Sequence, residues 1–180
     1  MTFTHPKSAD PYKKEADKRR SFFQATKTSH VMILTLKVAQ LSGVHAADKW
    51  EGVIEICSSS LLEDLHLAIQ DAVGFDNDHM YEFFIARTER SRERVSFNDE
   101  NGELYDATIG SLYPLPDRQH LYYLFDYGDY WIFRITRINK APQETGPHLT
   151  YPRLTHETGK RPEQYPAEGE EEEEGDGEDA

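Results

Sequence analysis

Three stretches of the chain alternate apolar and polar residues in the way that half-buried β-strands do. They lie at residues 30–41, 51–57 and 79–86, and each is rich in β-branched or aromatic side chains. In the first stretch, one face of the strand would carry Met32, Leu34, Leu36 and Val38. In the third, His79 and Glu82 would point to opposite faces, because side chains alternate along a strand. The pattern therefore predicts three strands of one sheet.

Between the second and third stretches, the apolar spacing changes to that of a helix. Ser60 and Glu63 have the spacing of a capping box, in which each side chain would bond the backbone amide of the other residue. Gly74 would end the helix in the left-handed conformation. The apolar residues between these signals are Leu62, Leu65, Ile69, Ala72 and Val73. We expect a capped amphipathic helix packed on one face of the sheet.

Residues 121–133 are the most strongly patterned part of the chain and predict an aromatic β-hairpin. A three-residue loop at 126–128, with Gly128 in the left-handed conformation, would pair Phe125 with Asp129. A two-residue loop would mix core and solvent positions, so burial selects the three-residue loop and places the hairpin in the core. The face toward the core would then carry Leu121, Tyr123, Phe125, Trp131, Phe133 and Ile135, and the other face would carry His120, Tyr122, Tyr130 and Arg134.

Asp126 and Asp129 lie at the tip of this hairpin and allow two interpretations. As turn residues, Asp126 would accept amide hydrogens and Asp129 would close the loop. As paired carboxylates, they could bind a cation or share a proton. Calcium and magnesium sites need several oxygen ligands, and the sequence has no dense D-x-D-x-D-G run. The turn interpretation is therefore favoured, and no metal or cofactor is expected.

Charge divides the 180-residue chain into three parts. Residues 1–28 carry seven Lys/Arg and three Asp/Glu, a net charge of +4, whereas residues 168–180 carry nine acids and no base, a net charge of −9. We expect a basic, partly helical extension (1–28), one α+β domain with a mixed β-sheet (29–166) and a disordered acidic tail (167–180). The basic extension could bind nucleic acid through Lys13, Lys14, Lys18, Arg19 and Arg20.

Several classes of function lack a sequence signal. Cys57 is the single cysteine, which excludes an intrachain disulfide and a cysteine-based zinc cluster. No signal-peptide core or apolar window of membrane-spanning length occurs, so we expect a cytoplasmic protein without a membrane partner. No nucleophile elbow, phosphate loop or helix-turn-helix is evident. The patterns therefore favour a protein that is not an enzyme.

Three motifs, "LLEDLHLAIQDAVGFDNDHMYEFFI", "LYYLFDYGDYWIFRITRI" and "YPRLTHETGKRPEQYP", follow one another along the chain. In this order they resemble the plasmid pRiA4b Orf-3-like domain family over about residues 30 to 166. Phe75 stands where the family usually has tryptophan, and Tyr81 replaces the second histidine of the strand motif. The residues that match include His66, Gln70, Gly74, His79, Glu82, Asp126, Gly128, Asp129, Trp131, Tyr151, Pro152 and Arg153.

The resemblance implies an α+β fold, an association with plasmids and mobile elements, and no established activity. We expect a binding or adaptor module for a protein or a small anionic ligand, in which Arg153 could clamp a carboxylate or phosphate bidentately. One alternative is a nucleic-acid-associated accessory of a mobile element, using the basic extension and the arginines of residues 87–94. A second is a hydrolase that uses His79 with the carboxylates. The candidate contact residues are His79, Glu82, Asp126, Asp129, Tyr151 and Arg153.

Overall fold

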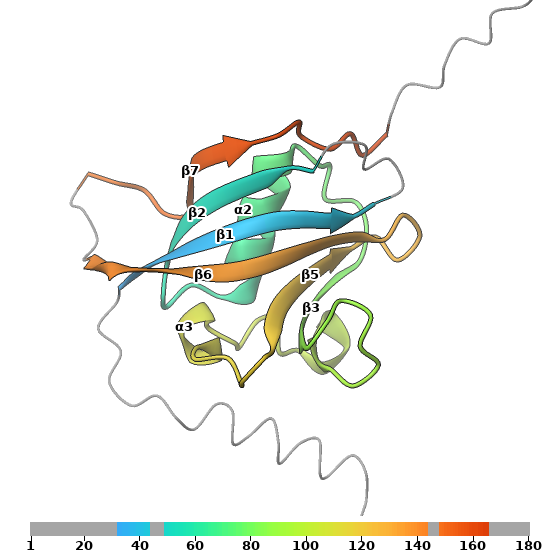
Figure 1. Ribbon diagram of the computed structural model, residues 1–180, viewed down its shortest axis with the longest axis horizontal. Coiled ribbons are helices and arrows are strands. Elements are labelled where there is room, and N and C mark those ends of the chain that lie inside the picture. Colours follow the sequence, from blue (N-terminus) through green and yellow to red (C-terminus); the bar gives the residue numbers. More distant parts are fainter. Residues whose placement is uncertain (1–31, 44–48, 144–147, 166–180) are drawn as a thin grey trace, which may run out of the picture.

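The computed structural model describes residues 32–43, 49–143 and 148–165 (Figure 1). The predicted basic extension and acidic tail lie outside the described residues. The elements are the strands β1 (Ile33–Ser42), β2 (Glu51–Cys57), β3 (Tyr81–Ala86), β4 (Val95–Phe97), β5 (His120–Phe125), β6 (Trp131–Gln143) and β7 (Arg153–Thr158), the helices α2 (Leu62–Val73) and α3 (Ile109–Leu112), and the 3₁₀ turn η1 (Asp99–Asn101).

The strands form one sheet in the order β4-β3-β5-β6-β1-β2-β7, and every neighbouring pair among these described strands is antiparallel. The α+β class is confirmed, but the expected mixed sheet is wrong. Parallel neighbours need a crossover that returns the chain beside the strand it left. Here α2 carries the chain from β2, next to one edge, to β3, next to the other edge. The crossover therefore adds no parallel pair.

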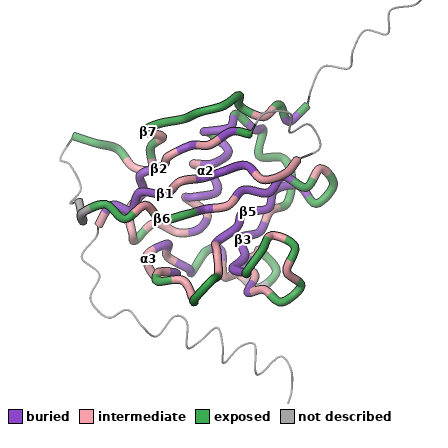
Figure 2. The backbone as a smooth tube through the Cα atoms, in the orientation of Figure 1, coloured by how far each residue is buried: buried purple, intermediate pink, exposed green. Residues whose placement is uncertain are grey.

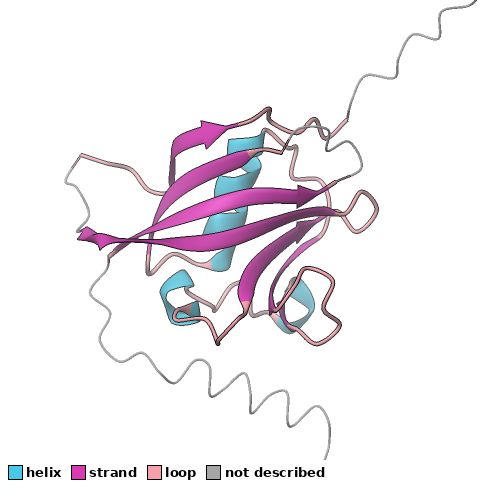
Figure 3. Cartoon of the chain, viewed as in Figure 1, coloured by secondary structure: helices cyan, strands magenta, loops and turns pink. Residues whose placement is uncertain are grey.

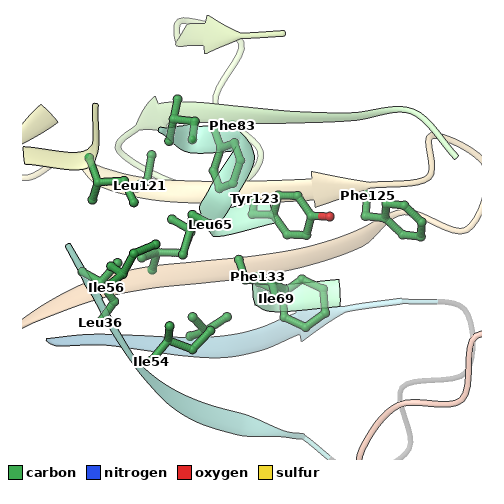
Figure 4. Close-up of a cluster of buried hydrophobic side chains, with 14 of the residues drawn as sticks. Leu36, Ile54, Ile56, Leu65, Ile69, Phe83, Leu121, Tyr123, Phe125 and Phe133 are labelled. Carbon is green, nitrogen blue, oxygen red and sulfur yellow. The ribbon is translucent and has the colours of Figure 1, made fainter. Parts of the chain in front are cut away.

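Helix α2 crosses one face of the sheet, behind β2, β1 and β6 in the view of Figures 1 and 3. Its sheet-facing side is buried, whereas Leu67 on the opposite side is 47% exposed. Figure 4 shows Leu65 and Ile69 of the helix among side chains from the strands. The buried residues around them include Leu36, Ile54, Ile56, Phe83, Leu121, Tyr123, Phe125 and Phe133. Removal of this apolar surface from water is the main force that holds the helix on the sheet.

The start of α2 differs from the predicted capping box by one residue. The N-cap is Leu61, and its backbone N–H donates to the Asp64 carboxylate at 2.8 Å. Leu61 also forms a β-bridge with Thr108, which keeps the chain extended one residue beyond Ser60. Glu63 instead accepts a hydrogen bond from the Tyr81 hydroxyl. The predicted Ser60–Glu63 box is therefore wrong, because a partner distant in sequence delays the start of the helix.

Gly74 follows α2 in the left-handed conformation, with φ of +79°, and its backbone N–H donates to the Gln70 carbonyl at 2.8 Å. A Cβ atom at this position would meet no atom within 4 Å. Backbone conformation, and not space, is therefore the reason for glycine here.

The aromatic hairpin of β5 and β6 has the predicted faces but a different register. Phe125 pairs with Trp131, Tyr123 with Phe133 and Leu121 with Ile135. The partners therefore lie two residues later than predicted, and the loop spans residues 126–130. A shift of two residues keeps every side chain on its face, since the strand period is two. All six residues predicted to face the core are buried, which confirms that part of the prediction.

The loop 126–130 is closed by Asp126, whose carbonyl accepts from the Tyr130 N–H at 2.8 Å and whose N–H donates to the Met80 carbonyl at 3.0 Å. Its carboxylate accepts from the Gly128 N–H at 2.7 Å, which confirms its predicted role in the turn. Positive φ occurs at Asp126 (+57°) and Tyr130 (+59°), and Gly128 is not in this conformation. Gly128 is small for another reason: a Cβ atom there would lie 3.1 Å from the Asp126 carboxylate.

The opposite face of the sheet holds a second buried cluster near β3, β5 and β6, where Figure 2 shows buried backbone. Tyr122, predicted on the face away from the core, is only 2% exposed. Its ring stacks on Phe84 with centroids 5.1 Å apart. The cluster consists of Phe84, Ala86, Tyr122, Leu124 and Ile132, with Leu41 packed against it. This end of the sheet is therefore apolar on both faces.

Candidate functional site

A cavity of about 540 Å³ opens beside the start of β3, where β4, η1 and the loop 126–130 meet. Its volume falls within the range of ligand pockets in proteins. Two lining residues, His79 and Glu82, belong to the predicted site. The full lining is His79, Met80, Tyr81, Glu82, Arg94, Ser96, Asn98, Asp99, Glu100, Leu104, Tyr105 and Tyr127.

Glu82 is the most deeply buried charged group of the cavity wall, at 2% exposure. Its carboxylate lies 2.7 Å from the Arg94 guanidinium, and the same guanidinium sits 4.6 Å from the Phe84 ring centroid. Burial raises the pKa of Glu82, while the Arg94 charge and a hydrogen bond to Ser96 oppose that rise. A buried charge is tolerated only when it is paired, so the Glu82–Arg94 pair fixes both side chains in the wall.

Large exposed side chains form the mouth of the cavity. Met80 is 73% exposed, Tyr105 51% and Tyr127 45%. The hydroxyl of Tyr105 is hydrogen-bonded to the carboxylate of Asp99, and this bond raises the pKa of Tyr105. Burial, followed by the negative charge of Glu82, raises the pKa of Tyr127. The mouth therefore combines apolar surface with a negative electrostatic potential.

A buried polar network lies directly behind the cavity wall. The His66 ring stacks on Tyr81, with centroids 3.5 Å apart and planes 1° from parallel. Its Nδ1 is 2.7 Å from the Tyr123 hydroxyl, and its Nε2 is 2.6 Å from Asn77 Oδ1. Gln70 donates to the Tyr123 hydroxyl and accepts from the Asn77 N–H. Asn77 Oδ1 can only accept, so neutral His66 donates to it from Nε2, and Nδ1 accepts from the Tyr123 hydroxyl.

Burial of His66 lowers its pKa, which agrees with a neutral ring. The i,i+4 spacing of His66 and Gln70 on a predicted helix was the sequence signal for this network. Both side chains use their hydrogen-bonding groups within the fold, so His66 is a structural histidine.

His79 lies before β3, not at its start as predicted, because the strand begins at Tyr81. The alternation of side chains therefore does not separate His79 from Glu82, and both residues line the same cavity. The expectation that they point to opposite faces of a strand is wrong for this reason.

Carboxylates surround the His79 ring. Nδ1 lies 2.8 Å from Asp78, and Nε2 lies 3.6 Å from Asp126. The hydrogen bond to Asp78, with smaller contributions from the charges of Asp126 and Asp129, raises the pKa of His79. Asp78 also accepts from the Tyr165 hydroxyl at 2.6 Å, and these bonds lower the pKa of Asp78. Asp126 thus lies beside His79 and the charge of Asp129 also acts on the ring, but neither aspartate lines the cavity.

The predicted residues Tyr151 and Arg153 lie elsewhere. Arg153 begins β7, and four strands separate β7 from β3 in the sheet. Its Nε and Nη2 both donate to Glu55 Oε2, at 3.0 and 2.8 Å, and its guanidinium lies 5.7 Å from the Tyr151 ring. The guanidinium that was expected to clamp a ligand therefore neutralises a buried carboxylate, and neither residue lines the cavity.

Sequence reasoning missed most of the cavity lining. Residues 87–106 mix arginines with acids and show no clear strand or helix pattern, yet they supply Arg94, Asp99, Glu100 and Tyr105. The available signal was the Asn101–Gly102 turn pair followed by apolar and aromatic residues. Gly102 does adopt positive φ, at +68°.

Neither a metal-binding cluster nor a membrane-spanning helix occurs among the described residues. No group of three or more His, Cys, Asp or Glu side chains among them is arranged to hold a metal ion. Within the same ranges, no helix has the length and apolar character needed to cross a membrane.

The family model for plasmid pRiA4b ORF-3-like proteins matches residues 40–166, which is well over half of the chain. The chain belongs to this family. A search of curated proteins gave no match. The ORF-3-like chain is also similar to the crystal structure of a protein of unknown function, MM3350, from Methanosarcina mazei Go1, with a TM-score of 0.56 and 20% sequence identity. The similarity covers 72% of this chain and 70% of that one, and it supports the fold.

The end of the matched region contacts the segment before β3 through Gln164 and Tyr165. Gln164 donates to Asp78 at 2.8 Å and accepts from the Asp76 N–H at 2.8 Å. The end of the matched region thus fixes the segment that carries His79.

Proposed function

We propose that this ORF-3-like protein is a binding module and that the cavity beside Glu82 and His79 holds a group of a partner protein. The observation that carries this proposal is the exposed mouth formed by Met80, Tyr105 and Tyr127 above a buried ion pair. Exposed aromatic rings around a buried polar anchor are typical of binding hot spots.

The state of His79 favours binding over hydrolysis. A general base needs an unprotonated nitrogen within reach of a substrate. In His79 one ring nitrogen contacts Asp78 and the other faces Asp126, and the raised pKa favours the charged ring. The hydroxyl of Ser96, which lines the cavity, is hydrogen-bonded to Glu82. These groups fix the cavity wall, and we assign them no step of a reaction.

The test is a comparison of partners captured from cell extract by the full chain, the Tyr105→Ala/Tyr127→Ala variant and the Tyr130→Ala variant. Tyr130 is a matched control, because it is 47% exposed in the same loop but does not line the cavity. We expect the wild type and Tyr130→Ala to retain the same proteins after nuclease treatment, and the double variant to lose them. Equal capture by all three chains would overturn the proposal.

A second candidate function is nucleic-acid association, and one observation favours it. Three arginines line a hollow of about 410 Å³ whose polar lining is Arg87, Arg92, Arg94, Ser91, Glu93 and Gln119. Arginines grouped around a hollow can bind phosphate oxygens. This function predicts binding to DNA that falls linearly with the logarithm of salt concentration and weakens in Arg87→Gln/Arg92→Gln. DNA affinity that is the same in this variant would remove the candidate.

A further inference from the structure

We propose that the group held in the cavity is a cation, the basic side chain of a partner polypeptide. This inference rests on the proposed function and names its ligand class. Of the two ligands expected from the sequence, a protein or a small anion, it keeps the protein and departs from the anion.

The charges that line the cavity do not balance. Arg94 is paired with Glu82 at 2.7 Å, and it is the only Lys or Arg in the described lining. Asp99 and Glu100 are both exposed and add two negative charges at the same wall. An anion entering the cavity would meet these carboxylates, whereas a cation would be attracted by them.

The His79 side of the cavity adds to this field. Its ring lies between Asp78 and Asp126, with Asp129 near enough to influence it. Even a charged His79 is outnumbered by these three carboxylates. The same negative potential acts on the tyrosine hydroxyls, because carboxylates contribute to the raised pKa of both Tyr105 and Tyr127.

The apolar surface of the mouth suits the remainder of a basic side chain. Lysine and arginine carry their charge on a chain of three or four methylene groups that packs on apolar surface. Met80, Tyr105 and Tyr127 provide such surface, and tyrosine faces attract cations directly. Tyr81 contributes less, because one face of its ring is already stacked on His66. A cavity of about 540 Å³ leaves room for one such side chain and part of its backbone.

The experiment is an NMR titration of the full-length chain with capped tripeptides that have glycine on both sides of lysine, norleucine or glutamate. Norleucine keeps the apolar stem and removes the charge. We expect the lysine peptide to shift the amide signals of Met80, Tyr105 and Tyr127, the norleucine peptide to bind about tenfold more weakly, and the glutamate peptide not to bind. Free 1,5-diaminopentane distinguishes a small amine from a polypeptide source, and we expect it to bind more weakly than the lysine peptide, because it lacks the backbone.

Variants test the same assignment from the side of the protein. Asp99→Asn/Glu100→Gln should weaken binding of the lysine peptide about three- to tenfold, since it removes the negative charge of both carboxylates. Asp117→Asn is the control, because Asp117 is exposed and does not line the cavity. Equal binding of the lysine and norleucine peptides, preference for glutamate, tighter binding of the free diamine, or no shift with any peptide would overturn the cation assignment. The Tyr105→Ala/Tyr127→Ala capture experiment would still decide the proposed function independently.

Discussion

The hydroxyl of Tyr123 should contribute strongly to stability, and Tyr123→Phe removes that single oxygen atom. The Tyr123 side chain is fully buried, and its hydroxyl contacts Gln70 Nε2 at 2.8 Å and His66 Nδ1 at 2.7 Å. Gln70 and His66 are 3% and 1% exposed, so water cannot replace the lost partner. Each buried polar group left without a partner costs about 1–3 kcal/mol, so the two groups together should cost about 2–6 kcal/mol.

Tyr113→Phe is the matched control. The Tyr113 hydroxyl is also buried, but no hydrogen-bond partner for it occurs among the described residues. Its removal leaves no group unsatisfied, so the free energy of unfolding should stay within about 0.5 kcal/mol of wild type or rise. Urea unfolding of the full chain measures both changes, provided that the m-value is the same in all three proteins. A Tyr123→Phe loss below about 0.5 kcal/mol, or equal losses in the two variants, would refute the assigned network.

Three further predictions concern the residues around the cavity and the opposite edge. Because the folded state raises the pKa of His79, the stability that this ring provides is present below its unfolded pKa of about 6.5 and is lost as the pH rises through the folded value. Wild type should therefore exceed His79→Gln in urea stability at pH 5.5, with the difference fading by pH 9; an unchanged difference would contradict this. Gly128→Ala should cost about 1 kcal/mol, because the added Cβ displaces the Asp126 carboxylate from the backbone amide it accepts from, and a thermal melt equal to wild type would count against that contact. Arg153→Ala should cost about 1–3 kcal/mol in urea unfolding by leaving buried Glu55 without its guanidinium, whereas unchanged stability would show that this pair contributes nothing.

Local patterns were enough to predict which side chains of the hairpin are buried, because the strand period of two determines the faces. The register was not predictable from the same pattern, since a shift of two residues leaves every face unchanged. What sets the register is the conformation of Asp126 and Tyr130 and the bond from Asp126 to the Met80 carbonyl. Met80 lies in the segment just before β3, so the hairpin sequence alone does not reveal that bond.

The same limit applies to the helix start and to the candidate site. Thr108 pairs with Leu61 across many residues and moves the N-cap away from Ser60. His79 and Glu82 were found by their residue types, but the cavity that joins them is built by Tyr105 and Tyr127 from other segments. Residue chemistry could be predicted from the sequence, whereas the meeting of distant segments could not.

The stacked rings of Tyr81 and His66 have a consequence for how this protein tolerates change. Tyr81 lines the cavity, and its ring also stacks on His66 of the buried network. A substitution at Tyr81 that reshapes the cavity wall therefore also disturbs the interior, and a substitution that repacks the interior changes the cavity wall. The shape of the cavity and the stability of the fold consequently depend on the same pair of rings.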